Sequence, residues 1–148
     1  MSFEIRPMQI GDYPEVLALW QHTQGIGLSG ADEPEAVQVF LERNPGLCYT
    51  AWSDQKIIGT VLCGFDGRRG YLYHLAVDVG YRHQGIGSAL MQRSLDELHR
   101  MGGQKCHLMV YFENTDAQAF YRQVGWDLRQ DIVIMSKDLG CHADGSAC

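Results

Sequence analysis

Three strand-like segments joined by short turns constrain the fold of this chain more than any other feature. They lie at 47–53, 57–65 and 71–77, and only the linkers DQK and DGRRG separate them. Linkers this short join antiparallel neighbours, because a parallel pair needs a crossover connection of a dozen or more residues. The middle of the chain is therefore predicted to form antiparallel hairpins.

Periodic patterns on both sides of this unit complete the expected fold. Helical spacing of apolar residues predicts four helices, at 12–20, 34–43, 85–101 and 115–124. Three further segments have the composition of strands, at 3–7, 105–111 and 131–137. The expected fold class is α/β (α+β), with a mixed, mostly antiparallel central sheet flanked by helices.

The chain contains no internal repeat and no long linker, so a single domain is expected over residues 1–139. Residues 140–148, GCHADGSAC, are mostly small and are expected to form a flexible C-terminal tail. Cys141, His142 and Cys148 lie in this tail, and no metal site is predicted there. Cys48, Cys63 and Cys106 lie in apolar segments, which is typical of buried, reduced thiols.

Composition and charge exclude several classes of function. The formal charge of −6 argues against a nucleic-acid partner, because binding phosphates requires a basic face. The sequence has no apolar run of 18 or more residues, so no membrane span is expected. The N-terminus lacks the basic and apolar regions of a secretory signal, and a cytoplasmic protein is therefore predicted.

The segment YRHQGIGSAL, residues 81–90, has the appearance of a phosphate-binding loop. It is not a P-loop, because no Lys follows either glycine. It does not complete a dinucleotide-binding fingerprint, because Leu90 stands where the third glycine belongs. A loop that enters a helix at Gly85 would still present free backbone N–H groups to a phosphate, and Arg82 would add positive charge. A pyrophosphate site is therefore expected here.

Two motifs in this region resemble a known family, the GCN5-related N-acetyltransferases. The acyl-CoA signature of that family, [R/Q]-x-x-G-x-[G/A], corresponds to residues 82–87, RHQGIG. Residues 114–126, NTDAQAFYRQVGW, are similar to the segment N-x-x-A-x-x-[F/L]-Y-x-x-x-G-[F/W] of the same family. The resemblance extends over about residues 3–137, and the expected order of elements matches the fold of the family.

The resemblance implies an N-acetyltransferase that moves an acetyl group from acetyl-CoA, its cosubstrate, to a primary amine by direct attack in a ternary complex. It implies that Tyr121 acts as general acid for the CoA thiolate. The backbone of 75–77 would bind the pantetheine arm as an added strand would, and one of its amides would polarise the thioester carbonyl. The implied cofactor-binding residues are Leu75, Ala76, Val77, Arg82, His83, Gln84, Gly85, Ile86, Gly87, Ser88, Asn114 and Tyr121.

The sequence departs from the family where many relatives carry a general-base glutamate. By motif spacing, those two positions fall at Tyr71 and Met109, and neither side chain is a carboxylate. Other groups near the expected site are His74, Asp32, Glu33 and Glu113, and a water chain would also serve, so no base is assigned. The missing carboxylate leaves an alternative function, a non-catalytic acyl-CoA-binding sensor or regulatory module.

The acceptor is expected to be a small-molecule amine or a protein amine. Its site is expected between the loop at 21–33 and the ends of the central strands. A second GIG, Gly25 to Gly27, lies in this loop without an Arg or Lys neighbour and is interpreted as a flexible segment. A homodimer is a further expectation, because the strand predicted at 131–137 would be exposed and able to pair with its mate.

Overall fold

A five-stranded sheet forms the centre of the molecule in the computed structural model, which describes residues 2–140. The strands follow one another across the sheet in chain order, β1 Glu4–Pro7, β2 Tyr49–Ser53, β3 Lys56–Phe65, β4 Gly70–Val77 and β5 Cys106–Leu108. The first four strands pair antiparallel, and β5 pairs with β4 in parallel. The predicted mixed, mostly antiparallel sheet is therefore confirmed.

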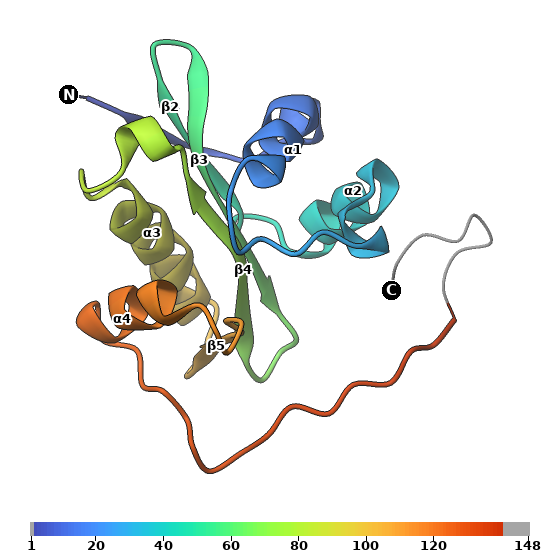
Figure 1. Ribbon diagram of the computed structural model, residues 1–148. Helices are drawn as coiled ribbons and strands as arrows, with labels where there is room; N and C mark the ends of the chain where they lie inside the picture. The colour runs from blue at the N-terminus through green and yellow to red at the C-terminus, as the bar shows by residue number, and fades with distance from the viewer. Residues whose placement is uncertain (1, 141–148) are drawn as a thin grey trace.

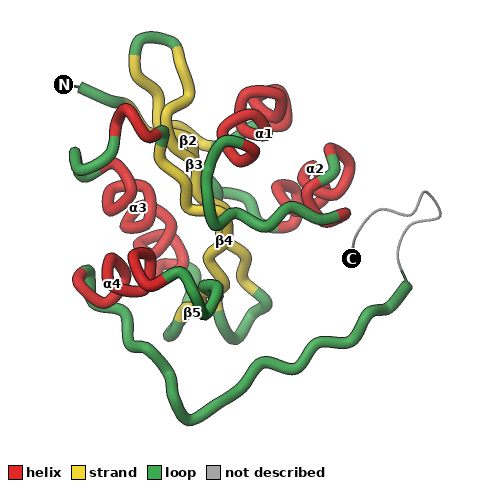
Figure 2. Tube along the Cα trace, viewed as in Figure 1, coloured by secondary structure: helices red, strands yellow, loops and turns green. Residues whose placement is uncertain are grey.

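Helices cover both faces of this sheet (Figure 1). On one face lie α1 Tyr13–Gln21 and α2 Pro34–Arg43, and on the other lie α3 Ile86–Arg100 and α4 Thr115–Gln123. Figure 2 shows the loops that join these elements, and three of them contain a 3-10 turn, η1 Ile10–Asp12, η2 Gly30–Asp32 and η3 Val79–Tyr81. Within residues 2–140, no helix is both long enough and apolar enough to cross a membrane.

Two apolar clusters, one on each face, hold the helices to the sheet. The α3 cluster contains Ile86, Leu90, Met91 and Leu98 of the predicted helical stripe, packed on the inner strands. The opposite cluster centres on Trp20 of α1, which is fully buried. Of the cysteines expected to be buried, Cys48 and Cys63 lie in these clusters and Cys106 is half-buried, and all three are free thiols.

The sheet opens between β4 and β5. Their pairing covers only Gly70 with Cys106, Tyr71 with His107 and Leu72 with Leu108. Beyond Leu72, the second half of β4 has a strand partner on the β3 side alone. Residues 73–77 therefore present a free strand edge inside the fold, and this edge is where the expected site lies.

The strand predicted at 131–137 is wrong for the described structure. Residues 127–140 have no strand partner and are exposed throughout, and the segment leaves α4 and runs outside the helices (Figure 1). A strand is defined by its ladder of hydrogen bonds, and apolar composition alone does not supply the partner. The predicted strand at 105–111 is likewise shorter, because only 106–108 pair with β4. The tail with Cys141, His142 and Cys148 lies outside the described residues.

Candidate active site

The loop that enters α3 has the form expected of an anion-binding turn. Gly85 is the N-cap of α3, with a left-handed φ of 80° that favours glycine, and no side chain caps it. The first intrahelical hydrogen bond of α3 runs from the Ala89 N–H to the Gly85 carbonyl, so the N–H groups of residues 86–88 lack an intrahelical acceptor. These groups and the exposed backbone at 82–85 can bind phosphate oxygens.

Arg82 connects this loop to the free edge of β4. Its Nε donates a hydrogen bond of 3.1 Å to the carbonyl of Val77, the last residue of β4. A Cβ added at Gly87 would lie 3.6 Å from Val77 Cγ2 and 3.8 Å from Phe120 Cζ, so α3, β4 and α4 converge at this residue. The turn, the strand edge and α4 therefore border one site.

The backbone predicted to hold the pantetheine arm lies on the free edge. Leu75, Ala76 and Val77 follow Leu72, where the pairing with β5 ends. On the other side, Ala76 and Val77 pair with Thr60 and Gly59 of β3, which fixes this part of the strand to the sheet. An extended chain can add to such an edge by backbone hydrogen bonds.

Asn114 has a structural role besides the expected contact with the cofactor, and its residue type already makes it, with Thr115, a candidate helix cap. It is the N-cap of α4, and its Oδ1 accepts a hydrogen bond of 3.1 Å from the Ala117 N–H. Only the Nδ2 group of its side chain is left for a ligand. The predicted contact with the cofactor therefore has to come from a donor, which suits a carbonyl or phosphate oxygen.

Tyr121 lies on α4 in the α3 cluster, between two aromatic neighbours. Its ring is edge-on to Phe120 at 5.2 Å and to Trp126 at 6.0 Å between centroids. Burial raises the pKa of Tyr121 to about 12, because the phenolate loses hydration. The phenol is therefore fully protonated at neutral pH and has a proton to donate.

The loop between α1 and α2 closes the other side of the site, and its glycines have a packing role. A Cβ at Gly25 would lie 2.8 Å from the Asn114 side chain, and a Cβ at Gly27 would collide with the Tyr111 hydroxyl. Gly25 also has a φ of 90°. The second GIG thus lies in a loop, as predicted, and it also makes a close contact with the β5–α4 segment that the sequence did not reveal.

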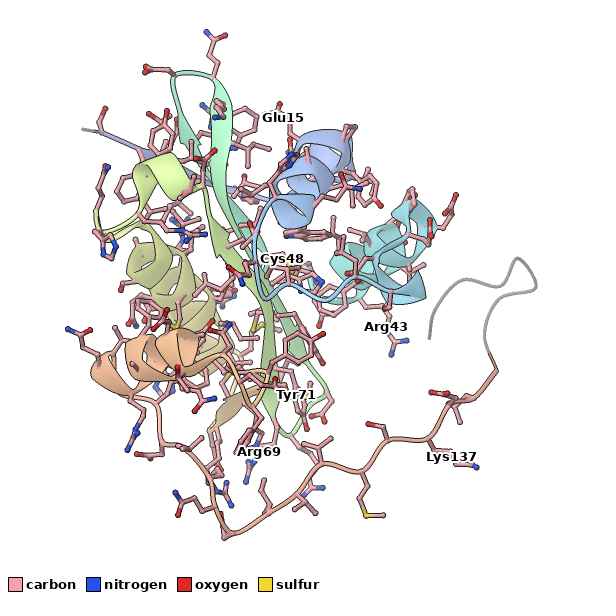
Figure 3. The ribbon with its side chains drawn as sticks, viewed as in Figure 1. Glu15, Arg43, Cys48, Arg69, Tyr71 and Lys137 are labelled. Carbon is pink, nitrogen blue, oxygen red and sulfur yellow. The ribbon has the colours of Figure 1, made fainter. Side chains whose placement is uncertain are left out.

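One pair of polar side chains emerges that sequence reasoning named only as separate candidates. Asp32 of η2 and His74 of β4 are 42 positions apart, and their side chains meet at 2.7 Å between Oδ1 and Nε2. Glu33 and Glu113, the other carboxylates considered, are exposed. Tyr71 lies where β4 runs beside β5 (Figure 3), its ring 5.8 Å from that of His107, and Met109 is exposed.

A sequence profile described as the acetyltransferase (GNAT) family matches residues 13–126. An acetyltransferase of Yersinia pestis, strain Pestoides F, is 33% identical over 137 residues, which cover 92% of this chain and 95% of that protein. An acetyltransferase of Sodalis glossinidius is 30% identical over the same shares of both chains.

Solved structures with the same fold carry more specific descriptions. The PaiA N-acetyltransferase of Thermoplasma acidophilum, in complex with coenzyme A, superposes with a TM-score of 0.78 at 21% identity, over 87% of this chain and 92% of that one. The ribosomal-protein-S18-alanine N-acetyltransferase of Escherichia coli gives 0.71 at 23% identity, over 84% and 77%. AAC(6')-Iy, in complex with a bisubstrate analogue of CoA and acetylneamine, gives 0.75 at 16% identity, over 93% and 99%.

Proposed function

The chain belongs to the GNAT family of acetyltransferases, and from that premise we propose that it transfers an acetyl group from acetyl-CoA to a primary amine by direct attack in a ternary complex. One observation carries the proposal. A turn with free N–H groups at α3 meets a free edge on β4, and α4, the helix that carries Tyr121, packs against the same turn through Phe120. Together they match the pyrophosphate, the pantetheine arm and the thiol of one ligand.

The donor would lie along these features from one end to the other. The pyrophosphate would accept hydrogen bonds from the backbone at 83–88, and Arg82 would add a positive charge at the edge of the site. The amides and carbonyls of 75–77 would pair with the pantetheine arm as a strand would. One of these amides would donate to the thioester oxygen when it gains negative charge, as an oxyanion hole does.

Tyr121 would supply the proton that the leaving thiolate takes up. A thiol has an ordinary pKa of about 8.5, and the same burial that raises the pKa of the phenol raises that of a thiol held beside it. The pKa of the bound thiol therefore lies closer to the pKa of the Tyr121 phenol than the pKa of a thiol in water does. Proton donation from the phenol then assists cleavage of the C–S bond.

The acceptor amine would approach from the side of the loop at 22–33. The structural relatives described above include one named as a ribosomal-protein-S18-alanine N-acetyltransferase and one bound to a bisubstrate analogue of CoA and acetylneamine. A small-molecule amine and a protein amine are therefore both retained as acceptor classes. The acidic chain, with a formal charge of −6, favours a cationic acceptor by long-range attraction.

An amine-panel assay tests this function. Purified protein is incubated with acetyl-CoA and a panel of polyamines, aminoglycosides, amino acids and N-terminal peptides, and the release of free thiol is followed. Turnover with at least one amine is expected. Tight binding of acetyl-CoA without thiol release on any amine would contradict catalysis and favour a binding module.

Tyr121→Phe tests the general acid in the same assay. The variant keeps the ring that packs against Phe120 and Trp126 and loses only the hydroxyl. We expect kcat to fall by about 10²- to 10⁴-fold, with the Kd of acetyl-CoA unchanged. An unchanged kcat on a substrate whose chemical step limits turnover would assign the proton donor elsewhere.

A further inference from the structure

His74 has an unusual position in β4, just before the edge expected to hold the donor. Its φ is 49°, in the left-handed region that few residues other than glycine adopt within a strand. Thr60 pairs with Ala76 and Leu62 with Tyr73, so His74 and Leu75 together oppose the single residue Val61. This two-against-one arrangement is a β-bulge, and bulges re-aim side chains beside functional sites.

The bulge turns His74 toward the α1 side of the sheet. In a regular strand successive side chains alternate between faces. Here Tyr73 contacts Phe40 of α2, and the next residue, His74, contacts Trp20 of α1. Leu75 then packs in the α3 cluster on the opposite face. The imidazole therefore lies on the face opposite Tyr121, immediately before the backbone that would hold the thioester.

A chain of hydrogen bonds holds this conformation. The Trp20 Nε1–H donates to the Thr60 hydroxyl at 3.0 Å, and that hydroxyl donates to the His74 carbonyl at 3.1 Å. The other oxygen of Asp32, Oδ2, accepts from the Ser29 N–H at 3.0 Å. The Tyr13 hydroxyl donates to the Asp32 carbonyl at 2.6 Å. Both ends of the Asp32–His74 pair are thus fixed by their surroundings.

The pairing determines which ring nitrogen of His74 is free. The His74 and Asp32 side chains are only 16% and 10% exposed, and Nε2 lies 2.7 Å from the carboxylate. A carboxylate accepts but does not donate, so neutral His74 has its proton on Nε2 and a lone pair on Nδ1. Among residues 2–140, Nδ1 has no hydrogen-bond partner. A carboxylate that fixes one nitrogen while the other takes a proton is the arrangement of a general base.

We propose that His74, oriented by Asp32, accepts the proton that the attacking amine loses, which fills the role left open by Tyr71 and Met109. The proposal rests on the proposed acetyl transfer. The amine nitrogen forms a bond to the acetyl carbon and passes one proton to Nδ1, directly or through one water. The C–S bond breaks, and the sulfur takes the phenolic proton of Tyr121. Return of the proton from His74 to Tyr121 through solvent restores both groups, so an amide and a free thiol are the only products.

His74→Asn is the sharpest test, because asparagine tolerates a left-handed backbone and cannot act as a base. We expect kcat/KM for the amine to fall by about 10²- to 10⁴-fold while the Kd of acetyl-CoA is unchanged. His99→Asn is the matched control, because His99 lies in the last turn of α3, away from the site, and is exposed. This control should retain the wild-type kcat/KM.

A pH profile separates a base from a structural residue. The titratable groups in this network are Asp32 and Tyr13, whereas Trp20 and Thr60 do not titrate. A general base acts only in its unprotonated form, so the pH profile of wild-type kcat/KM should have an acid limb, and this limb should be absent in His74→Asn. In His74→Gly, where glycine accepts the positive φ, added imidazole should restore part of the lost turnover.

Each outcome decides the proposal. Wild-type kcat/KM in His74→Asn would overturn it and leave the acetyl transfer standing. A loss at every pH with the acid limb retained and no rescue by imidazole would assign His74 a structural role only, and would also overturn it. Absence of thiol release from the wild-type protein would refute the acetyl transfer itself, and the assignment of a base with it.

Discussion

Gly85 and Gly87 lie two residues apart in the same turn, but the backbone demands glycine at only one of them. Gly85 has a φ of 80°, whereas Gly87 has ordinary helical backbone with only van der Waals contacts around an added Cβ. Gly85→Ala should lower the free energy of unfolding by about 1–2 kcal/mol, the cost of a left-handed alanine. Gly87→Ala should raise it by about 0.5–1 kcal/mol, because alanine favours the helix.

Urea unfolding of the two variants checks this contrast in the absence of any ligand. The measurement requires no knowledge of the acceptor, so it tests the geometry of the turn independently of activity. Equal effects of the two substitutions would mean that Gly85 does not hold its left-handed conformation in solution.

The buried phenol of Tyr121 should make stability depend on pH in the alkaline range. Its pKa is about 12 in the folded protein and about 10 when unfolded. Below pH 10 both states keep the proton. Between about pH 10 and 12 the unfolded chain ionises first, so the free energy of unfolding falls with rising pH, by up to roughly 2–3 kcal/mol.

The contribution of Tyr121 is isolated by comparison with Tyr121→Phe, because burial also raises the pKa of Tyr13, Tyr49 and Tyr73. The stability of wild type relative to the variant should decline between about pH 10 and about pH 12 in urea unfolding. A constant difference across this range would show that the Tyr121 hydroxyl is hydrated in the folded state.

At the scale of elements, the close approach of α3 to β3 sets the position of the turn at 82–87. A Cβ at Gly59 would lie 2.9 Å from Leu90 Cδ1, 3.2 Å from Ile86 Cγ2 and 3.3 Å from the Ala76 carbonyl oxygen. Gly59→Ala should therefore push the first turn of α3 from the sheet, at a cost of about 1–3 kcal/mol. It should also weaken acetyl-CoA binding, because the N–H groups of this turn move with the helix.

Thermal unfolding and acetyl-CoA titration of Gly59→Ala measure the two effects. Gly11→Ala is the matched control, because nothing lies within 4 Å of a Cβ at that position and its backbone is not left-handed. Leu90→Val should be less costly in the Gly59→Ala background than in the wild type, since the shorter side chain relieves the contact. Additive effects of these two substitutions would argue against the contact.

The sequence predicted elements best where their formation depends on neighbours in the chain. The hairpins of β2 to β4 and the buried stripe of α3 follow from short turns and from helical spacing, both local properties. The segment at 131–137 has strand composition, but whether it forms a strand depends on a partner that composition does not reveal.

The residues of the candidate site also differ in whether the sequence could predict them. The turn at 82–87 and the segment around Tyr121 could be located because their motifs are contiguous in the sequence. The pairing of Asp32 with His74 could not be predicted, because 42 positions separate the two residues and the bulge decides which face His74 occupies. The capping role of Asn114, in contrast, is local: Asn114 and Thr115 are both candidate caps from the sequence, and the structure has Asn114 as the N-cap of α4.

At the scale of the whole molecule, the segment beyond α4 carries a run of exposed apolar side chains. Ile132, Val133, Ile134 and Met135 are all exposed, with Met135 at 91%. The segment extends outside the helices as far as Lys137 and beyond (Figure 3). Four consecutive exposed apolar side chains in an extended chain favour association, because water is released when they are covered.

We expect a second copy of this chain to cover that surface. The outer edge of β5 is unpaired among the described strands, and the segment that follows β5 carries the exposed apolar side chains of Met109 and Phe112. Each copy thus offers both an apolar segment and a free strand edge, and a twofold arrangement would cover both of them at once.

Sedimentation velocity should show a dimer whose proportion grows with protein concentration. Val133→Asp should shift it to monomer, whereas Val39→Asp, an exposed valine on α2, should not. A wild-type monomer at every concentration, or equal dissociation by both substitutions, would contradict association through residues 132–135.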